Sequence, residues 1–303
     1  GNAFEVRWVV QDSAAKEQPM NKSIDISIVV CTYNRANALE RALESLFVQQ
    51  WPAGLEYEII VVDDGSTDNT PEIVCEANRR TDRCVVYVRE SGRGISVARN
   101  AGVEAARGEW IAFTDDDQIA EPAWLLNLWR AQERCGAECI GGARTLGLPE
   151  EVLRALPLQT RLILGEIQPA GKLRSCARDA LLCTGNLLVR RGLVIALGGF
   201  DVTLTQGGED TDLLLRLRRA GYACWFTPDA VVSHVIPAYR LEVGYLTWAA
   251  KRGGDCFALR DVREWGLWRP CCIAGARLGQ AVAVHLPCMW YARTIGRGAV
   301  ATA

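Results

Sequence analysis

The stretch Trp110–Asp117, WIAFTDDD in one-letter code, places an apolar run directly before three consecutive carboxylates. The run has the length of a buried β-strand, and side chains alternate between the two faces of a strand. Asp115 and Asp117 are therefore expected on one side, where the pair can share a cation. Unneutralised carboxylates this close repel one another, and a divalent ion removes that repulsion. A solvated acidic turn is the alternative interpretation.

On both sides of this stretch, runs of strand length alternate with segments of helical periodicity. Strands apolar on both faces and separated by single helices predict a parallel, doubly wound sheet, which binds ligands at the carboxyl ends of its strands. The expected strands are Ile26–Cys31, Glu58–Val62, Val85–Val88, Trp110–Phe113 and Cys139–Ala143, with others at 181–189 and around Cys224 and Val231; the expected helices span 39–47, 70–80, 95–107, 122–134 and 210–220. A short alternating run at 6–10 predicts an accessory strand.

Composition narrows the class of protein. The 303 residues allow one large α/β domain or two smaller ones, and 49% apolar with 23% charged residues is ordinary for a globular protein. A net charge of -2 does not favour nucleic-acid binding. The twelve cysteines are scattered without zinc-ribbon spacing, so we interpret them as reduced thiols. No leader of signal-peptide type is visible, and a cytoplasmic location is expected.

Further polar residues follow the earlier strands. Asp63 and Asp64 end one strand, and the turn after them enters a helix, so both acidic strand ends are expected on one rim of the sheet. Asp64 can accept hydrogen bonds from a base or ribose, whereas Asp63 is equally well explained as a helix cap. Gly92–Gly94 resembles the start of a dinucleotide fingerprint, but its sixth position is Val97, which makes a Rossmann dehydrogenase a minor alternative. Arg93 and Arg99 are candidate phosphate or base contacts.

Two later positions are candidates for chemistry. Glu209 and Asp210 follow two glycines and open a predicted helix, where a carboxylate is either a helix cap or a general base aimed at a substrate hydroxyl. His234 ends an apolar strand and is either structural or a ligand for Mn²⁺. Neither motif decides between its two interpretations alone.

Five motifs in order closely resemble family 2 glycosyltransferases of the GT-A fold. They are Ile28–Arg35 (IVVCTYNR), Val62–Asp68 (VDDGSTD), Ala98–Gly102 (ARNAG), Asp115–Asp117 and Gly208–Asp210. The resemblance covers about residues 26–236 and implies a Rossmann-like, mostly parallel sheet flanked by helices, here with a C-terminal helical extension. It also implies a nucleoside-diphosphate sugar as donor and Mn²⁺ or Mg²⁺ as cofactor.

The resemblance assigns roles residue by residue. Asp210 is implied as the general base, with Glu209 beside it near the acceptor. The implied nucleotide-binding residues are Thr32, Tyr33, Arg35, Asp64, Arg93, Arg99, Asp115 and Asp116; the implied metal site is Asp115, Asp117 and His234; the donor-sugar and acceptor segments contain Gly185, Asn186, Gly199, Phe200 and Asp201. A Gln-x-x-Arg-Trp motif, typical of processive members, does not follow the Glu-Asp pair, so transfer of a single sugar to a carbohydrate or glycolipid acceptor is expected.

The expected organisation has four parts: an accessory segment 1–24, a nucleotide-sugar-binding half 25–118, an acceptor-binding half 119–240 and a helical region 241–303. The last part holds eight basic and four acidic residues with several tryptophans between them, and its longest uncharged run, Leu278–Ala292, is shorter than the roughly 20 residues of a membrane span. Peripheral membrane contact is one interpretation, and packing on the domain or a second subunit is the other. A nucleotidyltransferase and a non-catalytic sugar-nucleotide-binding protein are the alternative functions.

Overall fold

The computed structural model describes residues 6–9, 23–52, 54–81, 84–176, 182–205, 207–268, 271–273 and 275. The chain divides into two compact units, residues 1–253 and 254–303. Most of the accessory segment 1–24, and Arg269, Arg277, Trp290, Tyr291, Arg293 and Arg297 of the tail, lie outside the described residues. In the described part of the chain, no helix is both long enough and apolar enough to cross a bilayer.

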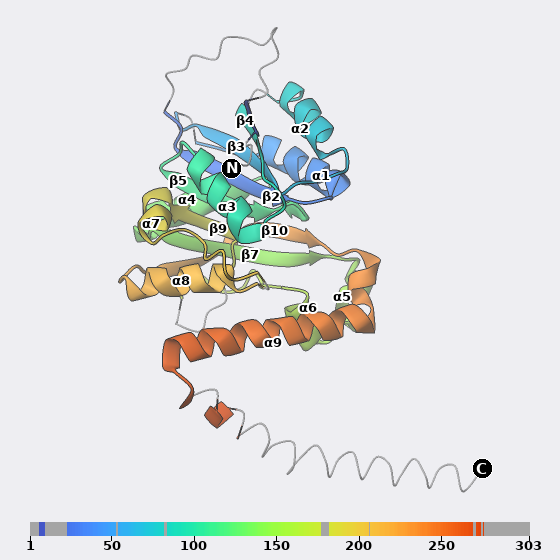
Figure 1. Cartoon of the computed structure of the whole chain (residues 1–303), viewed down its shortest axis with the longest axis vertical. Helices are drawn as coiled ribbons and strands as arrows, with labels where there is room; N and C mark the ends of the chain where they lie inside the picture. Colours follow the sequence, from blue (N-terminus) through green and yellow to red (C-terminus); the bar gives the residue numbers. More distant parts are fainter. Residues whose placement is uncertain are drawn as a thin grey trace, which may run out of the picture. The chain divides into compact units, whose positions relative to one another are not determined.

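The described strands of the first unit join in one mixed sheet (Figure 1). Its order is β1 (Val6–Val9), β4 (Cys84–Arg89), β3 (Tyr57–Asp63), β2 (Ile26–Thr32), β5 (Trp110–Asp115), β9 (Asn186–Arg190), β7 (Cys139–Gly147), β10 (Cys224–Val235) and β6 (Gln118–Ala120), with β8 (Arg174–Ser175) beside β10. The pairs β4–β3, β3–β2, β2–β5 and β7–β10 are parallel, whereas β9 runs antiparallel to both of its neighbours. The predicted mostly parallel α/β sheet is confirmed.

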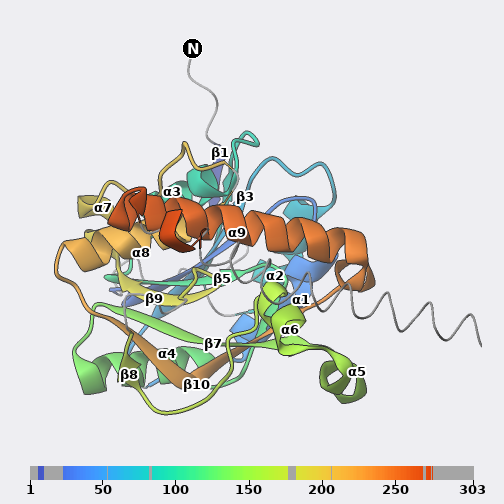
Figure 2. The same ribbon diagram turned by 90° about the horizontal axis from the view of Figure 1, so that it is seen from below.

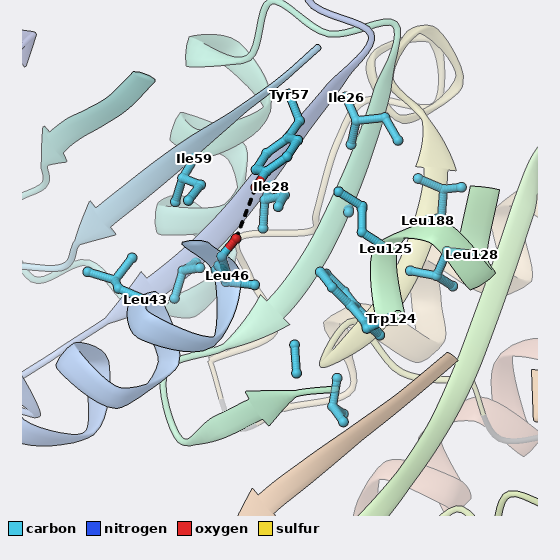
Figure 3. Close-up of a cluster of buried hydrophobic side chains, with 14 of the residues drawn as sticks. Ile26, Ile28, Leu43, Leu46, Tyr57, Ile59, Trp124, Leu125, Leu128 and Leu188 are labelled. Carbon is cyan, nitrogen blue, oxygen red and sulfur yellow. Dashed lines mark hydrogen bonds between the residues drawn. The ribbon is translucent and has the colours of Figure 1, made fainter. Parts of the chain in front are cut away.

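Helices cover both faces of this sheet, as Figure 2 shows from a second direction. On one face lie α1 (Ala36–Phe47), α2 (Thr70–Arg79) and α4 (Trp124–Cys135); on the other lie α3 (Ile95–Ala105), α7 (Arg191–Ala196) and α8 (Glu209–Arg219). Leu43 and Leu46 of α1 and Trp124 of α4 are fully buried against strand residues such as Ile28, and the Tyr57 hydroxyl donates to the Leu46 carbonyl at 3.1 Å (Figure 3). Burial of these apolar faces is the main stabilising contribution.

A third, smaller cluster links the last strands to four helical segments: α5 (Glu150–Ala155), α6 (Leu158–Ile163), the 3-10 helix η1 (Ala238–Leu241) and the start of α9 (Val243–Trp265). Leu146, Leu164 and Ile236 form its buried centre, and Tyr245 packs against them. The sequence showed no clear periodicity in the region of α5 and α6. The two strands expected around Cys224 and Val231 are one strand, β10, whose register shifts between Phe226 and Val231.

Candidate active site

The carboxyl ends of the central parallel strands bring the acidic residues to one edge of the sheet. Thr32 at the end of β2 pairs with Asp63 of β3, and Cys31 pairs with Asp115 of β5. The loops that follow these strands are tied together, because the backbone N–H of Asn34 donates to Ser66 Oγ at 2.8 Å. Loops on one rim of a parallel sheet are the usual position of a ligand site in such folds.

Asp116 anchors the loop after β2 to the end of β5. Its side chain is 5% exposed and accepts hydrogen bonds from Thr32 Oγ1 at 2.8 Å and from Arg35 Nη1 at 3.0 Å. Burial raises the pKa of Asp116 to about 6, although Arg35 opposes the shift. Tyr33 between the two anchors is 54% exposed, so its ring is free to pack against a ligand.

Asp64 lies in a pocket of backbone donors at the start of α3. Its two carboxylate oxygens accept from the N–H groups of Arg93 at 3.0 Å and Gly94 at 2.9 Å. Glycine at position 65 lets the loop after Asp64 come close to the loop that contains Gly92. A Cβ on Gly65, whose φ is +85°, would lie 3.0 Å from the Gly92 nitrogen. The Arg93 guanidinium pairs with Glu90. Burial raises the pKa of Asp64 despite the two backbone donors.

Asp117 meets His234 and two arginines. Asp117 Oδ2 lies 3.5 Å from His234 Nε2, and it accepts from Arg240 Nη2 at 2.9 Å and from Arg35 Nη1 at 3.1 Å. Burial alone would raise the pKa of Asp117, but His234, Arg240 and Arg35 together hold it well below its usual range. Two guanidinium groups therefore neutralise this carboxylate.

The partners of His234 determine its tautomer. Arg240 Nη1 lies 2.7 Å from His234 Nε2, and because a guanidinium only donates, Nε2 must be the acceptor. Nδ1 then carries the proton and donates to the Leu164 carbonyl at 3.2 Å. A neutral imidazole whose other nitrogen is oriented by a backbone acceptor is the form of histidine that binds metals. In this structure the Nε2 lone pair accepts from Arg240, so a metal ion at Nε2 would have to displace that guanidinium group.

The donor set fits a divalent cation in chemistry, with one carboxylate oxygen and one imidazole nitrogen facing each other. Ions of this kind commonly take one or two protein ligands and complete their shell with phosphate and water. Asp115 does not join the pair, because its carboxylate accepts from Gln118 Nε2 at 3.1 Å and lies 3.7 Å from Arg99 Nη2. Among the described residues, no three His, Cys, Asp or Glu side chains form one metal-binding cluster.

Arg99 connects the carboxylates of β5 with those of α8. Its side chain is 9% exposed, Nη1 donates to Glu209, and Nη2 lies 3.7 Å from Asp115 Oδ1. Burial would lower the pKa of Arg99, but Glu209 and Asp115 raise it far above its usual range. Glu209 Oε2 is buried and has no hydrogen-bond partner among the residues that the structure describes.

Asp210 follows at the start of α8, after two glycines with positive φ. Its Oδ1 accepts from the Thr211 N–H at 2.6 Å. Burial and the neighbouring Glu209 carboxylate raise the pKa of Asp210, while Arg99 lowers it. A carboxylate with a raised pKa is a better proton acceptor than an ordinary aspartate, as a general base requires.

Phe200 lies under the Arg99 guanidinium, whose central carbon is 5.5 Å from the ring centroid. The Phe200 ring is 1% exposed, and Asn100 holds its backbone through hydrogen bonds of 2.9 Å to the carbonyl and 2.7 Å from the N–H. Gly199 leaves room for Asn100, and Asp201 accepts from Thr203 in the following turn. This segment thus holds the Phe200 ring in contact with the Arg99 guanidinium group.

Gly185 and Asn186 occupy different environments. A Cβ on Gly185 would lie closer than 3.0 Å to Asp115 Oδ2 and to Gln118 Nε2. The glycine therefore borders the carboxylate rim, by which we mean the Asp115–Asp117 side chains at the carboxyl edge of the sheet. Asn186 is 1% exposed, and its amide bonds Trp124 Nε1 and the carbonyls of Ala143 and Ala230 at 2.7 to 2.9 Å. In this structure Asn186 crosslinks the strands beneath the site.

Three side chains that the structure places here are not predicted by the sequence motifs: Gln118, Arg144 and Arg240. Gln118 directly follows the acidic triplet, and Arg240 lies six residues after His234. Arg144 follows two glycines and an alanine on β7. None of these positions forms part of the five motifs, and nothing in local spacing links Arg144 or Arg240 to the carboxylates.

A mostly parallel sheet with paired carboxylates at its carboxyl edge, faced by a Glu-Asp pair at a helix start, defines the class of GT-A glycosyltransferases. The chain belongs to glycosyl transferase family 2, whose family model matches residues 27–198.

Among curated proteins, the chain is 28% identical over 209 residues to glycosyltransferase AglE of Haloferax volcanii, covering 69% of this chain and 66% of AglE, slightly under two thirds of that protein. It is 29% identical over 237 residues to the succinoglycan biosynthesis protein ExoM of Rhizobium meliloti, covering 77% of this chain and 72% of ExoM.

Solved structures share the fold. The mannosyltransferase PcManGT of Pyrobaculum calidifontis, solved with GDP-Man and Mn²⁺, superposes with a TM-score of 0.58 at 21% identity, covering 94% of this chain and 84% of that one. S. aureus TarS in complex with UDP superposes with a TM-score of 0.56 at 18% identity, covering 79% of this chain and 66% of that one. The predicted family and the GT-A fold are confirmed.

Proposed function

We propose that this chain transfers a single sugar from a nucleoside-diphosphate sugar to an acceptor hydroxyl with inversion at the anomeric carbon. The observation that carries the proposal is the buried Arg99, which joins Asp115 on the carboxylate rim to Glu209 beside Asp210. One residue thereby links the donor half, 25–118, to the acceptor half, 119–240. This arrangement suits a reaction in which a base faces a leaving diphosphate.

In the proposed mechanism, Asp210 accepts the proton of the acceptor hydroxyl, and the oxygen attacks the anomeric carbon from the face opposite the diphosphate. Burial and Glu209 raise the pKa of Asp210, which favours proton acceptance. Arg99 compensates the charge of Glu209, so that Asp210 is not forced to remain protonated. Base catalysis of this kind contributes about 10² to 10⁴ in rate.

The nucleotide is proposed to lie along the loops after β2 and β3. Tyr33 offers an exposed ring, and Asp64 is the carboxylate for the base, held by the Arg93 and Gly94 N–H groups. Asp117 and His234 would hold Mn²⁺ or Mg²⁺, which supplies positive charge to the departing diphosphate when bound. Arg35 and Arg240 already bring positive charge to Asp117.

The central experiment compares Asp210→Asn with the wild-type chain. We expect loss of sugar transfer with unchanged binding of nucleoside diphosphate, since the amide keeps the size of the side chain but cannot take a proton. Asp229→Asn, at an exposed position on β10, is the matched control and should transfer normally. Normal turnover by Asp210→Asn would remove Asp210 from the role of base.

The donor base is proposed to be uracil, and the acceptor a carbohydrate or glycolipid. A thermal-shift screen of UDP, GDP and dTDP with Mn²⁺ tests the base, because a ligand of the native state raises its stability with occupancy. The product of the reaction tests the class of enzyme. Release of nucleoside diphosphate supports sugar transfer, whereas release of pyrophosphate would indicate a nucleotidyltransferase.

Peripheral contact with the cytoplasmic face of a membrane through residues 241–303 is a further part of the proposal. Val243 is 80% exposed and Trp248 is 51% exposed, and Lys251 and Arg252 are exposed close by on the same helix. Aromatic and cationic side chains together suit an anionic lipid surface. Flotation with anionic liposomes should be lost in Val243→Glu/Trp248→Glu; equal flotation would contradict the contact.

A further inference from the structure

Arg144 on β7 is fixed in place by its backbone and by one side-chain nitrogen. Its N–H and carbonyl each form a hydrogen bond of 2.8 Å with Ile167, and Nε donates to the Gly165 carbonyl at 2.5 Å. Gly165 has a φ of +90°, and a Cβ there would lie closer than 3.0 Å to Nη2 of Arg144. The loop after α6 is therefore shaped around this guanidinium group.

The outer nitrogens of Arg144 have no partner in the described part of the chain. Neither Nη1 nor Nη2 donates a hydrogen bond to a described residue, and no carboxylate there lies within 4.0 Å of them. Burial by itself would lower the pKa of Arg144, but Cys183 and the carboxylates of Asp115, Asp210 and Asp117 raise it. A guanidinium group carries five N–H donors, and only one of them is used here.

The surroundings of Arg144 place it between the carboxylate rim and the proposed base. A Cβ on Gly185 would lie 3.2 Å from Arg144 Nη1 and closer than 3.0 Å to Asp115 Oδ2, so both groups border the same glycine. Asp210 feels the charge of Arg144, which lowers its pKa. The Asp64 carboxylate, in contrast, is held by the backbone of Arg93 and Gly94 in the other half of the domain.

We propose that Arg144 binds an oxyanion carried by the acceptor, a phosphate or carboxylate group close to the reacting hydroxyl. The inference rests on the proposed function, because it takes Asp210 as the base that the acceptor faces. The two outer nitrogens of one planar guanidinium group can each donate to one oxygen of such a group. Arg35 and Arg240 form ion pairs with Asp117, which we assign to the donor side. Arg144 is therefore the arginine that we assign to an anion of the acceptor.

The binding test uses inorganic phosphate as the probe and the full-length chain saturated with nucleoside diphosphate and Mn²⁺. Phosphate should raise the melting temperature of the wild type, and Arg144→Gln should lose this response while keeping its affinity for the nucleoside diphosphate. Arg154→Gln is the matched control, because the Arg154 side chain is 75% exposed and pairs with Glu150 in α5. This variant should respond to phosphate as the wild type does.

Arg144→Lys is a second variant that tests the proposal even if Arg144→Gln does not fold. Lysine keeps the charge but lacks the planar fork, so phosphate affinity should fall by roughly tenfold, as for loss of one charge-assisted hydrogen bond. An unchanged phosphate response in both variants would overturn the proposal. So would a response that disappears on saturation with nucleoside diphosphate, since the anion would then belong to the donor.

The same melting curves separate the two proposals. If no nucleoside diphosphate stabilises the wild-type chain, the proposed function fails. If nucleoside diphosphate stabilises the chain normally but phosphate binding does not depend on Arg144, the proposed function stands and only the acceptor anion is refuted.

Discussion

Replacement of Arg99 by methionine should destabilise the protein strongly. Methionine keeps most of the apolar stem but leaves Glu209, with 8% of its side chain exposed, without its cation, and it removes the cation 3.7 Å from Asp115. Breaking a buried ion pair by removing one partner costs about 3–5 kcal/mol. The free energy of unfolding, measured by urea denaturation with tryptophan fluorescence, should fall by this amount.

A second substitution identifies the cause of that loss. Glu209→Met in the Arg99→Met background removes the uncompensated carboxylate, so it should recover most of the stability. Arg154→Met tests an exposed pair, with both side chains about three-quarters exposed, and should cost less than about 1 kcal/mol. Equal costs for Arg99→Met and Arg154→Met would refute the assignment of Arg99 as a buried bridge.

Three further predictions concern the site and its support. Gly185→Ala should weaken nucleoside-diphosphate binding in calorimetry, because the new Cβ displaces Asp115 and Gln118, whereas Gly192→Ala, with nothing within 4 Å, should bind normally. Asn186→Ala should lower the free energy of unfolding by about 3 kcal/mol or more, since it leaves the Trp124 N–H and two carbonyls unpaired in the core. A loss below about 1 kcal/mol would contradict this prediction. Cys176 should be alkylated slowly at pH 8 and faster at pH 10, because burial raises its pKa to about 11 and keeps it a thiol at the lower pH. The exposed Cys271 and Cys272 should be modified first. Mass spectrometry of timed samples measures the order of modification.

Local pattern predicted the first half of the fold well. The run Ile26–Cys31 is apolar on both faces, and β2 is buried in the centre of the sheet. The helix expected at 70–80 begins at Thr70 with Pro71 in its first turn, as the fixed φ of proline favours. The three-residue strand β6 was not predicted, because a segment this short carries no periodicity of its own. Its place in the described sheet comes from antiparallel pairing with β10, which lies far along the chain.

The sequence by itself determined the alternation of strands and helices and the position of the acidic residues at strand ends, since both follow from the spacing of neighbouring side chains. Only the tertiary structure decided that Arg99 pairs with Glu209, that Arg240 meets Asp117 and His234, and that the outer nitrogens of Arg144 have no partner in the described chain. These contacts join residues up to 123 positions apart. Their geometry depends on how strands from both halves of the sheet are ordered, which periodicity along the chain does not encode.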